Sequence, residues 1–311
     1  MKDYTRIEFK TIDNVTLRGD FFKAAGDGVP CIVMTQGLSL LKEHYLQNYA
    51  RKFVEAGFSC LVYDHRGFGS SDGSPRHETN TMQQAADYHD AITAAMNLSG
   101  VDRNRICLWG IGHSGGAAMI AAADEPRVAA IVLNMPFQSG AYDAANFPPG
   151  LLQKVWKDRE AQTASANPQP TYVALWPTSK ANARGEEGER TFLTSEPALD
   201  FITRGVEMSN AAGTPWENHF TLQSFFHLSS VEPRHYLPKI DPTKLLYIAA
   251  EQDPITGTLE EHRFNFGTVK PGAEFAVVKP DHLATYHGKP FEEMIAVQID
   301  FLKRKFECES R

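Results

Sequence analysis

The chain has 311 residues, of which 42% are hydrophobic and 22% charged, and its formal net charge is -7 at pH 7. This composition is typical of a globular protein and argues against a disordered chain. The negative charge and the lack of clustered Lys and Arg argue against nucleic acid as a partner, because phosphate binding needs concentrated positive charge. No segment approaches the roughly 20 apolar residues that span a bilayer, so we expect no membrane partner.

The cysteines point to a reducing compartment. Cys31, Cys60 and Cys107 lie in apolar, strand-like runs, and the spacing of the four cysteines shows no disulfide framework. A buried free thiol behaves as a small apolar side chain. The N-terminus also shows no apolar signal core. We therefore expect a cytoplasmic protein.

The first 135 residues alternate strand and helix patterns. Two stretches, 7–10 and 15–18, alternate apolar and polar residues, as half-exposed antiparallel strands do. Continuous apolar runs, typical of parallel strands covered on both faces, follow at 31–34, 59–63, 106–109 and 128–133. Helical patterns separate them, including one expected to begin after Thr81, with Gln84 as the partner of Thr81 in a capping box. This order predicts an α/β fold with a mostly parallel central sheet flanked by helices.

The alternation of strand and helix patterns stops after about residue 136. It resumes with strand patterns at 245–248 and 275–278, followed by a final amphipathic helix. We predict a core formed by residues 1–139 and 236–311, and an inserted cap at 140–235 that is too long for a structureless loop. Most of the cap's aromatic residues should form its own small core and its seam with the main domain. A cap also leaves an apolar pocket, and the predicted substrate contacts are Trp176, Trp216, Phe220, Phe225 and Phe226.

The strongest chemical signal is the sequence Gly112-His113-Ser114-Gly115-Gly116. It follows an apolar run and precedes a helix of small residues, which is the context of a nucleophile on a strained strand-to-helix turn. We therefore predict Ser114 as a nucleophile. The alternative is a glycine-rich turn that serves only packing or phosphate binding.

A serine nucleophile needs a base, and the base needs an acid that orients it. Asp253 follows the apolar run 245–250 and is the predicted acid, with Glu251 as the weaker alternative. His282 follows the last strand pattern and is the predicted base, with His287 as its rival. Both predicted residues come at the carboxyl ends of strands, where α/β folds place their ligands.

An acyl-transfer site also needs N–H donors for the oxyanion. We predict the backbone N–H of Gly115, directly after the nucleophile, and that of Leu38, on the loop after the first buried strand. The sequence Asp64 to Ser71 is glycine-rich but lacks the lysine of a phosphate-binding loop, so we interpret it as an architectural turn.

Taken together, these segments resemble the α/β-hydrolase superfamily. The resemblance rests on the Gln-Gly turn at 36–37, the Asp-x-Arg-Gly-x-Gly-x-Ser turn at 64–71, the 112–116 turn, Asp253 and His282. Within the superfamily, residues 33–42 and 282–288 are similar to the dienelactone-hydrolase-like and X-Pro-peptidase-like group, which includes fungal polyketide-pathway hydrolases and acyltransferases. Gln36 departs from that group, where many members have His, and Leu283-Ala284 replaces a frequent Phe-Asp.

The resemblance implies ester, thioester or lactone chemistry and no metal or organic cofactor. We expect a serine hydrolase for a medium-to-large apolar acyl substrate, with secondary metabolism as its setting. Hydrolysis is favoured because water needs no second site, and transfer of the acyl group to another metabolite is the alternative. Carbon–carbon cleavage or a rearrangement in the same pocket, and a catalytically silent ligand-binding receptor, are the further alternatives.

Overall fold

The computed structural model describes residues 3–308. Eight strands form one sheet in the order β1-β2-β4-β3-β5-β6-β9-β10. β1 and β2 pair antiparallel and β2 runs antiparallel to β4, whereas the strands from β4 to β10 are parallel to their neighbours. The strands are β1 (Thr5–Lys10), β2 (Thr16–Phe22), β3 (Val29–Thr35), β4 (Ser59–Tyr63), β5 (Val101–Ile111), β6 (Val128–Asn134), β9 (Leu245–Gln252) and β10 (Glu274–Asp281).

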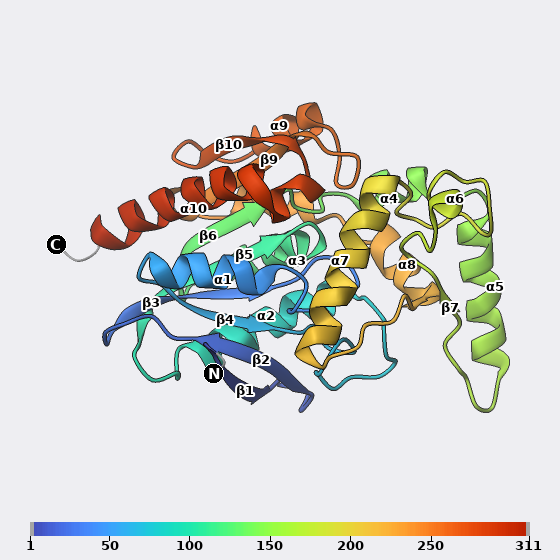
Figure 1. Ribbon diagram of the computed structural model, residues 1–311, viewed down its shortest axis with the longest axis horizontal. Coiled ribbons are helices and arrows are strands. Elements are labelled where there is room, and N and C mark those ends of the chain that lie inside the picture. The colour runs from blue at the N-terminus through green and yellow to red at the C-terminus, as the bar shows by residue number, and fades with distance from the viewer. Residues whose placement is uncertain (1–2, 309–311) are drawn as a thin grey trace.

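Helices cover both faces of this sheet. α1 and α10 lie on one face and contact each other, while α2 and α3 pack together on the other face (Figure 1). The helices are α1 (Leu46–Glu55), α2 (Thr81–Ala95), α3 (His113–Ala122), α9 (Leu259–Phe266) and α10 (Gly288–Cys308). β3, β4, β5 and β6 are almost wholly buried where they cross the core, which explains their continuous apolar sequence. The α/β fold predicted from the sequence is confirmed.

Residues between β6 and β9 form a group of helices at the carboxyl ends of the parallel strands (Figure 1). They include the short antiparallel pair β7–β8. The elements are α4 (Gly140–Asn146), α5 (Leu151–Ala164), β7 (Tyr172–Val173), α6 (Lys180–Ala183), α7 (Glu196–Ala212), β8 (Phe220–Thr221) and α8 (Leu222–Ser229). We call residues 140–235 the cap.

The cap has an aromatic core of its own. Phe225 lies 5.1 Å from Phe220 and 5.2 Å from Phe147, measured between ring centroids, and all three rings are buried. Phe226 instead packs against the exposed Trp156 and under the guanidinium of Arg159. Phe220 and Phe226 therefore stabilise the cap and do not fit the predicted role in substrate contact.

Two smaller sequence predictions are also settled. Asn80, one residue before the predicted cap Thr81, caps α2: its side chain accepts a hydrogen bond from the Gln83 N–H, so Thr81 forms no capping box. Cys31, Cys60 and Cys107 are free and buried, as predicted. No helix within residues 3–308 combines the length and apolarity needed to cross a membrane.

A buried ionic cluster holds the loop after β3 against the turn after β4. Lys42 Nζ lies 2.8 Å from Asp64 Oδ2 and 2.7 Å from Glu43 Oε1, and all three side chains are nearly inaccessible. Asp64 also accepts the backbone N–H groups of Lys42 and Ser70. Gly69 has φ +49° and lies so close that a Cβ there would be 2.4 Å from Asp64 Oδ2. The 64–71 segment is thus an architectural turn.

We expect Lys42→Met to lower the free energy of unfolding by about 3–5 kcal/mol, because it leaves two buried carboxylates without their cation. Urea unfolding followed by tryptophan fluorescence measures this. Lys52→Met is the matched control, since Lys52 forms an exposed pair with Glu292 and should cost under about 1 kcal/mol. Equal losses in both variants would contradict a structural role for the cluster.

Candidate active site

Asp253 and His282 meet at the carboxyl edge of the sheet. Asp253 follows the end of β9 and His282 follows the end of β10, and these strands are parallel neighbours. Their side chains join through a hydrogen bond of 3.0 Å between Asp253 Oδ2 and His282 Nδ1. Both residues are buried, at 7% and 4% exposure. The structure thus brings together the acid and base predicted from the sequence.

The two rival residues lie elsewhere. Glu251 is exposed and forms an ion pair with Lys279. His287 is exposed at the start of α10. Neither is hydrogen-bonded to the Asp253–His282 pair in the described part of the chain.

Asp253 is built to stay ionised despite its burial. Burial disfavours the carboxylate, but His282 and the hydroxyl of Thr256 outweigh this effect and lower the pKa of Asp253 to about 2. The backbone N–H groups of Ile255 and Thr256 also donate to its other oxygen. A charged Asp253 accepts the proton of Nδ1, so the neutral imidazole presents Nε2 as a proton acceptor.

Nε2 of His282 faces the sharp turn between β5 and α3. β5 ends at Ile111 and α3 begins at His113, so Gly112 alone forms the turn, with φ 55° and ψ −122°. A Cβ built on Gly112 would lie 3.3 Å from both Nε2 and Cε1 of His282. Gly112 therefore occupies the position where this kind of turn presents a nucleophile to its base.

The structure contradicts the prediction of Ser114 as the nucleophile. Ser114 is wholly buried in the first turn of α3. Its hydroxyl accepts the Ile111 N–H at 2.9 Å and lies 2.8 Å from the carbonyl oxygen of Thr35, to which it donates. It makes no hydrogen bond with His282. The sequence prediction centres the turn on Ser114, two residues after the observed turn at Gly112. The segment Gly110-Ile111-Gly112-His113-Ser114 has the same spacing of small residues, with glycine at the central, reactive position.

The position of the turn also changes which backbone N–H group is the candidate oxyanion donor. Gly115 packs tightly inside the fold, since a Cβ on Gly110 would lie 2.7 Å from its nitrogen and a Cβ on Gly115 itself would lie 2.9 Å from Pro136. Its nitrogen therefore lies against Gly110, inside the turn. The residue after the turn is His113, whose nitrogen lies about 4.0 Å from a Cβ built on Gly37. Its N–H and the predicted N–H of Leu38, which follows Gly37, are the candidate donors.

Two cap tryptophans hold the loop that carries Leu38. Trp176 donates from Nε1 to the Ser39 hydroxyl at 2.9 Å, and Trp216 donates from Nε1 to the Ser39 carbonyl at 2.8 Å. Gln36 braces the same loop, because its amide oxygen accepts the Gly37 N–H at 2.8 Å. Sequence reasoning assigned both tryptophans to substrate contact. Their indole N–H groups instead hold Ser39 on the loop after β3.

Two neighbouring cavities are lined mainly by cap residues. The first has a volume of about 310 Å³ and reaches Pro254 and Leu283, which directly follow Asp253 and His282 in the sequence. The second, also about 310 Å³, lies inside the cap and is lined in part by Phe225. Phe192 and Arg190 border both cavities. Of the five predicted substrate contacts, Phe225 is the one that lines either of these two cavities.

Asp143 of α4 lines the first cavity and was not singled out from the sequence. It is buried, with 8% exposure. Burial, together with the charges of Asp253 and Glu232, raises the pKa of Asp143 to about 8. A carboxyl group that is protonated at neutral pH and lines a cavity can donate a hydrogen bond to a substrate. No sequence pattern indicates this property, because it depends on what the fold packs around the side chain.

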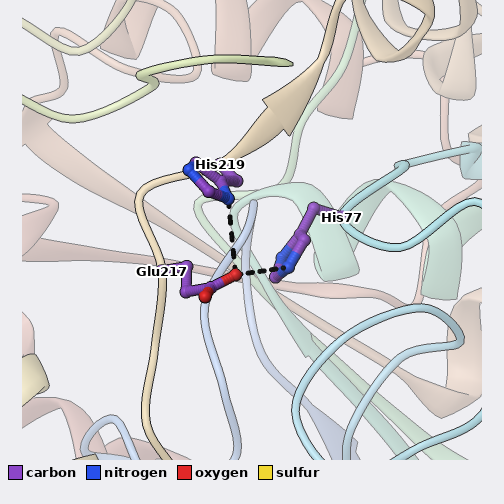
Figure 2. Close-up of side chains that lie close together, drawn as sticks. All are labelled: His77, Glu217 and His219. Carbon is purple, nitrogen blue, oxygen red and sulfur yellow. Dashed lines mark ion pairs between the residues drawn. The ribbon is translucent and has the colours of Figure 1, made fainter. Parts of the chain in front are cut away.

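A separate cluster lies where the cap meets the loop before α2. Figure 2 shows Glu217 between His77 and His219, with its Oε2 3.3 Å from a ring nitrogen of each histidine. Two imidazoles and a carboxylate are donors that a zinc ion accepts, so this cluster is chemically able to hold one divalent cation. None of the three is hydrogen-bonded to Asp253 or His282 in the described residues.

The sheet order, the cap and the buried Asp–His pair opposite a strand-to-helix turn define an α/β-hydrolase. Residues 17–231 match the family described as X-Pro dipeptidyl-peptidase (S15 family). The match spans more than half of the chain, and the chain belongs to this family.

Relatives narrow the class further. The chain is 31% identical to a polyketide transferase, grgF, from Penicillium sp., over 96% of this chain and 95% of the relative. It is 28% identical to a thiohydrolase from Eupenicillium brefeldianum, over 96% and 93% of the two chains. The crystal structure of the α/β hydrolase GrgF from Penicillium sp. sh18 superposes with a TM-score of 0.80 at 29% identity, covering 97% of this chain and 98% of that one.

A second solved structure, that of DcsB in complex with its substrate analogue, superposes with a TM-score of 0.78 at 28% identity, covering 97% and 99% of the two chains. These matches confirm the predicted class, a hydrolase or acyltransferase with the α/β-hydrolase fold. They also confirm the predicted likeness to fungal polyketide-pathway enzymes.

We expect Ser114→Ala to lower the free energy of unfolding by about 1–3 kcal/mol, because it leaves the buried Ile111 N–H and Thr35 carbonyl unpaired. Turnover per folded molecule should stay within about threefold of the wild type. Urea unfolding and steady-state rates on an acyl thioester measure the two effects. A variant of unchanged stability that loses about 10³-fold in rate, as triad removals do, would restore Ser114 as the nucleophile.

We expect the titration of Asp143 to lower the free energy of unfolding as the pH rises from about 4 to about 8. Its folded pKa of about 8 exceeds the ordinary aspartate pKa of 3.8, so over this window the folded protein holds a proton that the unfolded chain releases. Asp143→Asn removes this titration. Its melting temperature relative to the wild type should therefore increase between pH 5 and pH 8.5.

Asp200→Asn, at an exposed position of α7, is the control and should leave the pH dependence unchanged. Thermal unfolding at several pH values compares the three proteins. If wild type and Asp143→Asn melt in parallel across this range, Asp143 is not protonated in the folded protein at neutral pH.

Proposed function

We propose that this protein acts on a thioester, ester or lactone of a medium-to-large apolar acyl group and passes the acyl group to water or to a second metabolite. The observation that carries the proposal is the buried Asp253–His282 pair, whose free Nε2 faces the turn at Gly112. A base in this position can remove a proton from an attacking group and return it to a leaving group. The N–H groups of His113 and Leu38 supply the oxyanion donors.

A thioester is the favoured substrate, and a polyketide-type acyl chain the favoured acyl group. Relatives named thiohydrolase and polyketide transferase support this choice. The neighbouring cavities also support it, because one reaches Leu283, the residue after His282, and the other shares Phe192 with it and extends to Phe225. An extended apolar chain gains about 25 cal/mol per Å² that it buries there, before ordering costs.

Hydrolysis needs only water beside His282, and transfer to an acceptor is the second candidate. Two observations favour the second candidate: the presence of two bordering cavities and a relative named acyltransferase, drtE, from Aspergillus calidoustus. We further propose a cytoplasmic location, supported by the three free buried cysteines. The partner is then a small acyl substrate, with neither nucleic acid nor a membrane involved.

The proposal predicts a dependence on acyl length and on His282. With N-acetylcysteamine thioesters, kcat/KM should rise from acetyl to at least hexanoyl, by up to about 0.8 kcal/mol, or about fourfold, for each buried CH₂. His282→Ala should lower kcat/KM by about 10²- to 10⁴-fold, since the base is lost, and Asp253→Asn should be somewhat milder. Thiol release and product masses provide the measurement.

His287→Ala is the matched control, because this exposed histidine is five residues from His282 and should leave the rate unchanged. A preference for acetyl would contradict the apolar acyl site. Full activity in His282→Ala would refute the role of the pair. Binding of acyl thioesters without any turnover would instead indicate a receptor.

A further inference from the structure

The turn position of this active site carries no nucleophile. Gly112 has the backbone conformation and the placement opposite Nε2 of His282 that a nucleophile would need, yet it has no side chain. Among the side chains of residues 3–306, no serine, threonine or cysteine is hydrogen-bonded to that nitrogen. Ser114 bonds to the backbone of β3 and β5, and Cys31, Cys60 and Cys107 lie inside the sheet.

Burial also makes these thiols poor replacements. Desolvation raises the pKa of the Cys31 thiol to about 12, and it raises the pKa of Cys60 and Cys107 well above the ordinary value. A thiol must lose its proton to act as a nucleophile. No cysteine of the core is therefore available to form an acyl-enzyme.

The turn itself is nevertheless fully formed. The Gly112 N–H donates to the Asn134 carbonyl at 3.0 Å, and the Gly112 carbonyl accepts the Phe137 N–H at 2.8 Å. The space above it is bounded by His282, which a Cβ at Gly112 would nearly touch. A water takes up about 30 Å³, which is close to the room that a serine side chain would fill.

We propose that this protein moves its acyl group directly from the substrate to an attacking hydroxyl, without an acyl-enzyme. The inference rests on the proposed function and assigns the site above Gly112 to the attacking molecule. That molecule is a water or the hydroxyl of an acceptor, and both present an O–H to Nε2 of His282.

The step balances without a further reactant. The attacking oxygen forms a bond to the thioester carbonyl carbon while its proton moves to Nε2 of His282. The charge that develops on the carbonyl oxygen lies at the N–H groups of His113 and Leu38. Collapse of the intermediate breaks the C–S bond, and the leaving thiolate takes the proton back from Nε2. The products are a thiol and a carboxylic acid or ester.

The experiment compares the wild type with Gly112→Ser and Gly112→Ala. Each protein is treated with a fluorophosphonate, and each is analysed by intact mass during turnover of a hexanoyl thioester. The wild type should turn over substrate with no burst, no fluorophosphonate label and no acyl adduct. Gly112→Ser should be labelled at position 112 and accumulate an acyl adduct there, because the new hydroxyl lies beside Nε2.

Gly112→Ala is the matched control for the added Cβ and its positive φ. It should stay unlabelled and lose at least about tenfold in kcat/KM, because its methyl group fills the space of the attacking molecule. Adding His282→Ala to Gly112→Ser should abolish labelling. Circular dichroism and melting temperature establish that each variant is folded.

The outcomes separate the two proposals. An acyl adduct on any residue of the wild type during turnover would overturn direct transfer and leave the proposed function standing. A folded Gly112→Ser that takes no label would overturn the assignment of position 112. A wild type that turns over no thioester or ester, beside a Gly112→Ser that acylates, would overturn both direct transfer and the proposed enzymatic function. Supplying candidate alcohols to the wild type separates hydrolysis from transfer through the product mass.

Discussion

The sharp turn between β5 and α3 determines where each reacting group can stand. Its packing is so close that a Cβ on Gly110 would lie 2.4 Å from the Ser114 carbonyl oxygen, and one on Gly116 would lie 2.7 Å from that of Phe137. The Ser114 hydroxyl fastens the same turn to β3 through Thr35. These contacts aim Gly112 at His282 and leave the N–H of His113 beside the loop after β3.

The cap links the two halves of the site through a series of aromatic contacts. His282 lies beside Tyr286, which meets Phe201 of the cap at 4.9 Å between ring centroids. Phe201 stacks on Trp176 at 5.5 Å, and Trp176 holds Ser39 on the oxyanion loop. His282 and the loop after β3 are therefore joined through cap residues Phe201 and Trp176. A rearrangement of these cap residues would affect both.

The sequence was sufficient for the parts of the site that follow from strand ends. Asp253 and His282 each come directly after an apolar strand pattern, and parallel neighbours necessarily end at the same edge. The nucleophile position was misplaced because two overlapping glycine spacings share Ser114, and a glycine leaves no side-chain signal of its own. The structure extends β5 to Ile111, two residues beyond the apolar run that ends at Trp109, and the turn therefore falls at Gly112. Contacts such as that of Trp176 with Ser39 arise only from tertiary packing. The same holds for the burial that raises the pKa of Asp143.

Glycine at position 112 changes the energetics of the turn as well as its chemistry. A residue with a side chain in this positive-φ conformation costs about 1–3 kcal/mol of strain, which glycine avoids. The Asp253–His282 pair gives the opposite effect, because burying a charged carboxylate costs several kcal/mol that a pair of apolar residues would not. All of its stabilising hydrogen bonds converge on the carboxylate and on Nδ1, while Nε2 is left without a protein partner in the described residues. The fold thus buries a carboxylate at a cost in stability, and this carboxylate orients His282 toward the glycine turn. Stability alone does not explain this arrangement. A role for His282 as proton acceptor for an attacking molecule does explain it.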